Sequence, residues 1–110
     1  MNLKIVSLES FKREIKNLFK KYKKLPQDLK TLQKALLKNP KSGVALGNNC
    51  YKIRLANSSI PTGKSGGFRV IYYYLDKHNN IYLLSMYSKT ELENISDERL
   101  SEILNANGLK

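Results

Sequence analysis

Residues 67–75 read Gly-Phe-Arg-Val-Ile-Tyr-Tyr-Tyr-Leu, a run dominated by β-branched and aromatic side chains. Such side chains favour extended backbone, and a run with so few polar residues is typical of a strand in the middle of a sheet. Its one charged residue, Arg69, is costly to bury without a partner, so we expect the guanidinium to reach a cleft or an anion. The run therefore predicts a central strand that carries one cation.

Two neighbouring segments predict strands on either side of it. In residues 51–56, Tyr, Ile and Leu alternate with Lys52, Arg54 and an alanine, so apolar side chains share one face and cations the other. Residues 81–87 are again apolar and aromatic, and residues 76–80 form a polar hairpin connection. Short links between these strands predict an antiparallel meander.

The N-terminal part predicts a short strand followed by two helices. Residues 3–7 are the strand, and Ser7 is placed to cap a helix whose apolar residues recur at helical spacing up to Tyr22. Pro26 is well placed as the first residue of a second helix. Residues 40–49 are rich in Gly, Asn and Pro and predict a loop.

The C-terminal part predicts a third helix. Ser96 can cap it, Ile95 and Leu100 can pack across the cap, and Gly108 can end it. Residues 1–110 thus predict a single α+β domain in the order β-α-α-β-β-β-α. We expect an N-terminal helical hairpin and a C-terminal helix packed on one face of an antiparallel sheet.

The charge is strongly positive and unevenly distributed. Twenty Lys and Arg against nine Asp and Glu give a net charge of +11. Residues 1–42 carry twelve basic and three acidic side chains, whereas residues 91–110 carry two and five. This excess favours a polyanion or an acidic protein as the partner, although a lysine-rich soluble surface is the plainer interpretation.

Several classes of site are disfavoured by composition. One cysteine, Cys50, and one histidine, His78, leave no internal disulfide and no multi-cysteine or two-histidine metal site, and we expect no metal and no cofactor. Cys50 is expected to be a small buried apolar residue, and His78 a surface residue of the hairpin. No apolar run approaches the roughly 20 residues of a membrane span, so we expect a cytoplasmic protein.

Gly63-Lys64-Ser65 resembles the end of a phosphate-binding P-loop, but the motif is incomplete. The glycine that should precede it by five residues is replaced by Ser58, and a strand follows in place of a helix. We therefore expect Lys64 to lie on an ordinary loop.

Four cations can meet on one face of the expected sheet. Lys52 and Arg54 share a strand face, Arg69 lies on the central strand, and Lys89 follows the last strand. Nearby tyrosines offer aromatic surface on which bases could stack: Tyr72, Tyr73, Tyr74, Tyr82 and Tyr87. The alternative is that these tyrosines belong to the core and the cations to a solvated face.

Three segments carry a resemblance to a known family. They are YKIRL at 51–55, GKSGGFRVIYY at 63–73 and LLSMYSK at 83–89. Together they resemble the RelE superfamily of bacterial toxins, above all its HigB-type branch, and the resemblance runs from about Phe11 to Leu104. It implies a type II toxin–antitoxin toxin, a metal-independent endoribonuclease that cuts mRNA in the ribosomal A site.

The resemblance also implies roles for individual residues. Lys52 corresponds to a possible base and Arg54 to a phosphate clamp, because an arginine does not lose its proton. Arg69 matches the arginine that holds the scissile phosphate, and Lys89 an acid or charge stabiliser. Lys41, Lys64 and Tyr87 are the expected further RNA contacts. Well-studied members use a tyrosine near the C-terminal helix, where residues 94–96 read Asn-Ile-Ser, so we expect Tyr87 to substitute.

The implied partners are the 70S ribosome, mRNA and a cognate antitoxin. In the HigB-type branch the antitoxin is typically a helix-turn-helix protein, which would connect the toxin to operator DNA only through their complex. Two alternatives stay open at this point. One is a ParE-type toxin that acts on DNA gyrase, although that branch lacks the basic set found here. The other is a non-catalytic module that binds RNA or the ribosome and leaves the RNA intact.

Overall fold

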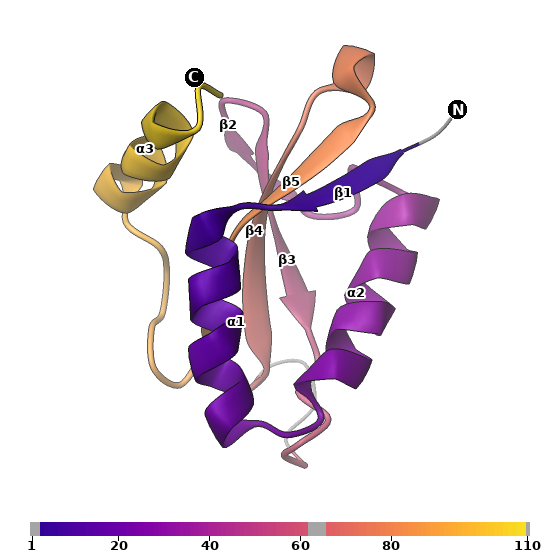
Figure 1. Cartoon of the computed structure of the whole chain (residues 1–110), viewed down its shortest axis with the longest axis vertical. Helices are drawn as coiled ribbons and strands as arrows, with labels where there is room; N and C mark the ends of the chain where they lie inside the picture. Colours follow the sequence, from indigo (N-terminus) through magenta and orange to yellow (C-terminus); the bar gives the residue numbers. More distant parts are fainter. Residues whose placement is uncertain (1–2, 62–65, 110) are drawn as a thin grey trace.

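β4 (Phe68–Tyr74) is the central strand of a five-stranded sheet with the order β1-β5-β4-β3-β2. The computed structural model describes residues 3–61 and 66–109. The other strands are β1 (Lys4–Ser7), β2 (Val44–Gly47), β3 (Cys50–Leu55) and β5 (Asn80–Ser88), and the helices are α1 (Glu9–Lys21), α2 (Leu25–Lys38) and α3 (Asp97–Ala106), with a 3₁₀ turn, η2, at Asp76–His78. The predicted α+β class and the predicted central strand are confirmed (Figure 1).

The predicted antiparallel meander is confirmed as β3, β4 and β5. β1 adds a feature that the sequence did not predict, because it pairs with β5 in the parallel direction. The ladder of β4 and β5 also contains a bulge. Ile71 is opposite Ser85 and Tyr72 is opposite Leu83, so Leu84 is an extra residue in β5.

β2 is a strand in the segment that the sequence predicted to be a loop. All four of its residues are exposed, so no alternation of apolar and polar residues marks it. The feature of the sequence that does mark this strand is the turn that follows it. Asn48 and Asn49 both have positive φ angles, 53° and 63°, which is the backbone of a two-residue hairpin and is tolerated best by Gly and Asn. This turn returns the chain into β3.

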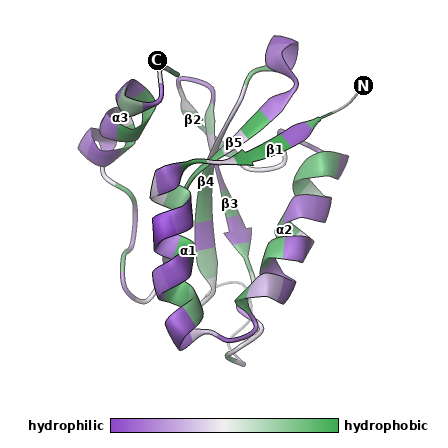
Figure 2. Cartoon of the chain, in the orientation of Figure 1, coloured by the Kyte–Doolittle hydropathy of each residue, from purple (hydrophilic) through white to green (hydrophobic). Residues whose placement is uncertain are grey.

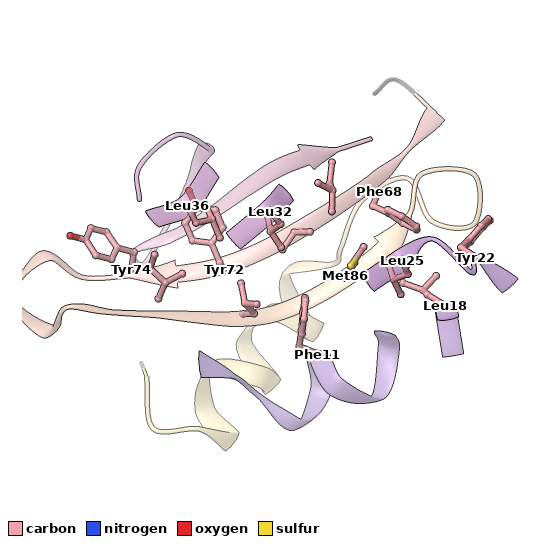
Figure 3. Packing of buried hydrophobic residues seen from close by; sticks show 14 residues of the cluster. Phe11, Leu18, Tyr22, Leu25, Leu32, Leu36, Phe68, Tyr72, Tyr74 and Met86 are labelled. Atoms are coloured by element: carbon pink, nitrogen blue, oxygen red, sulfur yellow. The ribbon is translucent and has the colours of Figure 1, made fainter. Parts of the chain in front are cut away.

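The helices cover both faces of the sheet, so the prediction that they share one face is wrong. α1 and α2 pack Phe11, Leu25 and Leu32 against one face, to which β4 contributes Phe68, Val70, Tyr72 and Tyr74 (Figure 3). α3 packs Leu100, Ile103 and Leu104 against Ile71 and Tyr73, which alternate onto the opposite face. Because β4 is covered on both sides, its run of side chains is apolar on both faces.

The helices differ in how their first turns are capped. Hydrophilic and hydrophobic residues alternate along α1 and α2, as expected for helices with one buried face (Figure 2). Ser96 caps α3 as predicted, accepting a hydrogen bond from the Arg99 N–H at 3.1 Å. The predicted cap of α1 is wrong, because its N-cap is Leu8 and no side chain bonds to the first turn. No helix within the described ranges is long and apolar enough to cross a membrane.

α1 lies along the edge of β5 where β1 has ended. The last paired residue of β1 is Ser7, opposite Leu83. Beyond that point the Ser10 hydroxyl donates to the Leu84 carbonyl at 2.6 Å, and a Glu14 carboxylate oxygen accepts from the Met86 N–H at 3.3 Å. The other Glu14 oxygen accepts from the Ser85 hydroxyl at 3.2 Å. Two side chains one helical turn apart thus replace the backbone of a missing strand neighbour.

We predict that Glu14→Ala lowers the free energy of unfolding by about 1–3 kcal/mol, because it leaves the Met86 N–H and the Ser85 hydroxyl without their acceptor. Glu14→Gln keeps an oxygen for the Met86 N–H and should lose much less. Urea denaturation measures both. Glu9→Ala is the matched control, since Glu9 lies on the same helix with an 86% exposed side chain. Equal losses for Glu9→Ala and Glu14→Ala would contradict this role.

The buried Glu14 carboxyl should also make the free energy of unfolding depend on pH, and Glu14→Gln tests this. Burial raises the pKa of the Glu14 carboxyl above its ordinary value of 4.5, against the opposing hydrogen bonds from Ser85 and Met86. The folded state then binds this proton more tightly than the unfolded state, so its contribution to stability is lost as the pH rises from about 4.5 through the raised pKa. Glu14→Gln lacks this proton, and its stability relative to the parent should improve across that window in urea titrations at successive pH values.

Candidate functional site

Three side chains form a row across the middle of the sheet. In the strand register, Arg54 of β3 is directly opposite Arg69 of β4, and Arg69 is directly opposite Tyr87 of β5. Residues that are directly opposite project to the same face, with Cβ atoms roughly 5 Å apart. The row therefore places two guanidinium groups and one phenol side by side, on the face of the sheet that also carries α3.

Lys52 and Lys89 flank this row. Lys52 precedes Arg54 by two residues and so shares its face, and its Nζ donates to Asn94 Oδ1 at 3.0 Å. Lys89 follows Tyr87 by two residues, and its N–H donates to the Gly67 carbonyl at 3.0 Å, so the pairing of the two strands continues two residues past Arg69. The backbone of β3, β4 and β5 thus brings together the four cations that the sequence singled out.

Gly67 allows the strands to approach closely at this end of the sheet. A Cβ atom at position 67 would collide with the Leu55 carbonyl oxygen. A glycine is therefore needed here for steric reasons, next to the row.

Arg69 is almost completely buried, with 5% of its surface exposed. Its Nη1 donates to the Phe68 carbonyl at 3.1 Å. Its cross-strand neighbour Arg54 is exposed and has the same charge, and like charges directly opposite each other destabilise a sheet. Two guanidinium groups on adjacent strands direct several N–H donors to one face of the sheet, so the row is suited to a phosphate.

Tyr87 is also buried, with 6% of its surface exposed. Burial raises the pKa of its phenol, while the Ile95 backbone and the Arg69 charge act in the opposite direction. The phenol therefore keeps its proton at neutral pH. Among the described residues its oxygen has no hydrogen-bond partner of ordinary geometry, which leaves a proton donor beside Arg69.

The segment before α3 covers this face of the row. Asn94 accepts the hydrogen bond from Lys52, and Ile95 packs against the cluster that contains Tyr87. Glu91, at the start of the segment, pairs with Lys21 of α1 at 3.0 Å. Asn94 was missed at the level of sequence, because no local pattern links it to Lys52, 42 residues away.

Most of the tyrosines are core residues, so the expected aromatic surface is largely absent. Tyr72, Tyr73 and Tyr74 are all buried, on alternate faces of β4. Tyr72 stacks on Tyr51 with ring centroids 5.2 Å apart. Tyr82 is half-buried and packs on Tyr73. The alternative in which the tyrosines fill the core is the correct one for this run.

The remaining candidates lie elsewhere. Lys41 is exposed at the opposite end of β4 and pairs with Asp76 at 3.1 Å, so it is not part of the row. Lys64 falls outside the described residues. Cys50 is buried as predicted, and burial raises the pKa of its thiol to about 11, so it is no nucleophile at neutral pH. His78 is exposed on η2, also as predicted.

We predict opposite effects on stability for two Tyr→Phe substitutions. Tyr87→Phe removes a buried hydroxyl that has no hydrogen-bond partner of ordinary geometry among the described residues, so stability should stay unchanged or rise by up to about 1 kcal/mol. Tyr72→Phe removes the oxygen that accepts from the Gly43 N–H at 3.1 Å and should cost about 1–2 kcal/mol. Urea unfolding of the two variants checks this, and a comparable loss in both would show that the Tyr87 hydroxyl is bonded.

Comparison with known proteins identifies the fold on which this site is built. No protein-family model matches the chain. Among solved structures, a mutant of the E. coli toxin RelE in the free state has a TM-score of 0.60 and 22% identity, over 96% of this chain and 98% of that one. The same mutant in complex with a peptide of the antitoxin RelB has a TM-score of 0.55 and 23% identity, over 93% and 94%. The isolated E. coli RelE toxin has a TM-score of 0.55 and 21% identity, over 94% and 97%. Over nearly its whole length, the chain has the fold of the RelE toxins.

Proposed function

We propose that this protein is the toxin of a type II toxin–antitoxin pair and an endoribonuclease that cuts mRNA in the ribosomal A site. The observation that carries the proposal is the row of Arg54, Arg69 and Tyr87, flanked by Lys52 and Lys89, on a RelE-like fold. The sequence segments that resemble the HigB-type branch are the ones that build this row. They are YKIRL, GKSGGFRVIYY and LLSMYSK.

The proposed reaction uses the RNA itself as the nucleophile. A ribose 2′-oxygen bonds to the adjacent phosphorus, the bond from phosphorus to the 5′-oxygen breaks, and the products are a 2′,3′-cyclic phosphate and a 5′-hydroxyl. One group must accept the 2′-OH proton, another must give a proton to the leaving 5′-oxygen, and donors must stabilise the charged phosphorane. The proton count balances without a co-reactant.

The row and the two lysines that flank it divide these tasks. Arg69 and Arg54 would bind the non-bridging phosphate oxygens, because the planar guanidinium suits bidentate contact with phosphate. The row contains no histidine and no carboxylate, so we assign the 2′-OH proton to Lys52. The leaving oxygen would be protonated by Lys89 or by Tyr87, whose phenol stays protonated because burial raises its pKa.

Substrate must displace part of the protein to reach this row. Arg69 and Tyr87 are only 5% and 6% exposed, and Asn94 holds Lys52 through its side-chain amide. We therefore propose that binding of the message moves the Asn94–Ile95 segment and exchanges the Lys52 contact from Asn94 to RNA. An exposed hydrogen bond of this kind is worth about 1 kcal/mol, which a phosphate contact can offset.

The charge supports the proposed partners. A net charge of +11 favours association with the ribosome and the message, and it makes that association strongly dependent on salt. The same charge suits an antitoxin with an acidic toxin-binding surface. A helix-turn-helix antitoxin that connects the complex to operator DNA is part of this proposal, as is action in the cytoplasm.

We predict that Arg69→Ala and Lys89→Ala each reduce cleavage by about 100-fold or more, the usual cost of removing a group that stabilises a charged transition state. The measurement is cell-free translation followed by primer extension on the message, with and without ribosomes. Lys77→Ala is the control, because Lys77 is exposed on η2, away from the row. Urea unfolding establishes that each variant folds.

In-frame cuts that require both ribosomes and Arg69 would support the proposal. An intact message under active translation would contradict it. Normal cutting by Arg69→Ala and Lys89→Ala would retain the activity but place its site elsewhere.

A further inference from the structure

The outer side of the helical hairpin carries large apolar side chains in contact with solvent. α1 and α2 pack on the same face of the sheet (Figure 1). Phe19 of α1 and Leu37 of α2 are nevertheless 44% and 42% exposed. Apolar surface gains free energy when it leaves water, so a continuous exposed apolar patch marks a place where something else binds. None of the roles proposed for the reaction uses this side of the molecule.

Phe19 borders an apolar groove between the two helices. A cavity of about 350 Å³ lies there, and five of its seven lining residues are apolar. A second cavity, of about 220 Å³, extends toward β1 and reaches Leu83 of β5. Ile15 of α1 and Leu29 of α2 line both cavities, so the two form one groove. The groove is therefore apolar from its mouth, beside Phe19 and Pro26, down to the core.

Lysines flank this groove. On α1 they recur every four residues, in a stripe next to that of Ile15 and Phe19, and on α2 another two are spaced by four. In the turn between the helices, the Lys23 Nζ lies 5.1 Å from the centroid of the Phe19 ring. The exposed set is Lys12, Lys16, Lys20, Lys23, Lys30 and Lys34. We call the groove and these six lysines the lysine-rimmed surface.

Acidic side chains offset little of this charge. α1 and α2 contain three of them, Glu9, Glu14 and Asp28. Glu14 is bonded to β5, and Asp28 is 3% exposed and accepts from the Ser58 N–H. Among the described residues, Glu9 alone pairs with one of the six lysines, Lys12, at 3.6 Å. The lysine-rimmed surface is therefore cationic around an apolar centre.

This combination suits a membrane surface better than a nucleic acid. Lysines attract anionic headgroups, and apolar side chains between them can enter the boundary between headgroups and acyl chains. RNA would satisfy the lysines equally well. Within the outer cavity, however, Phe19 is the one aromatic ring on which a base could stack, and the other apolar residues are aliphatic or proline. Acyl chains can contact all of them.

We propose that the lysine-rimmed surface binds membranes that contain anionic phospholipids, with Phe19 inserted at the level of the acyl chains. The inference goes beyond the proposed function and does not rest on it. The row of Arg54, Arg69 and Tyr87 lies on the opposite face of the sheet, the face that carries α3. A chain bound in this way would therefore keep the row directed away from the lipid.

The test uses the full chain, which contains no tryptophan, so that a single introduced one reports only on its own surroundings. Phe19→Trp exchanges one exposed aromatic residue for another and should preserve the fold. We expect a saturable blue shift of its fluorescence on vesicles of equal parts phosphatidylglycerol and phosphatidylcholine. Binding to pure phosphatidylcholine should be at least about tenfold weaker. Raising the ionic strength from about 0.05 M to about 0.5 M should also weaken binding.

Matched variants separate this surface from the rest of the molecule. Leu46→Trp places the same reporter at a 39% exposed position on β2, at the opposite edge of the sheet from α1, and should show no blue shift. Lys16→Glu and Lys77→Glu change the net charge equally. Added to Phe19→Trp, Lys16→Glu should weaken binding by about tenfold. Lys77→Glu, which changes an exposed residue of η2, should weaken it much less.

Four outcomes would overturn the inference. The first is an absence of a shift on phosphatidylglycerol vesicles, and the second is an equal shift for the two tryptophan reporters. The third is an equal loss from Lys16→Glu and Lys77→Glu, which would indicate attraction to net charge alone. The fourth is a response of the Phe19→Trp reporter to a single-stranded RNA but not to vesicles, which would assign the surface to RNA. The assay contains no ribosomes and measures no cleavage, so its result is independent of the proposed function.

Discussion

The edge of β5 sets the arrangement of the whole molecule, because the C-terminal half of this strand has no strand on the side away from β4. β1 ends opposite Leu83, one residue before the bulge at Leu84. From there Ser10 and Glu14 of α1 hydrogen-bond to β5. α1 therefore docks on this edge of the sheet as well as on one of its faces. α1 and α2 cover one face and α3 covers the other, so β4 and β5 are buried almost completely.

The candidate site follows from that burial. Tyr87 is in the half of β5 that α1 stabilises, and its register with Arg69 and Arg54 aligns the three side chains. None of the three is adjacent to another in sequence, so the row exists only in the folded chain. The bulge contributes as well. The extra residue in β5 shifts the alternation of side chains between Leu83 and Met86, so that Tyr87 falls on the face of Arg69 rather than on the face of α2.

Sequence reasoning succeeded where the chemistry is local and failed where it depends on distant contacts. Side-chain alternation in residues 51–56 and the apolar runs at 67–75 and 81–87 located the meander, and Ser96 located the start of α3. β2 was missed because an exposed edge strand shows no buried face, and only Asn48-Asn49 marks it. Three consecutive tyrosines cannot reveal that both faces of their strand are covered, and nothing near Asn94 indicates its contact with Lys52.

The pair of arginines across β3 and β4 has a consequence for how this gene tolerates mutation. Like charges held directly opposite one another repel and lower the stability of the sheet. Replacing the exposed Arg54 with an uncharged residue of similar volume removes that repulsion, so we expect such a chain to fold and to escape proteolytic clearance. Alleles of this kind can persist in a population, because protein quality control has no misfolded chain to remove. Stability and the proposed function are opposed at this one position in the sheet.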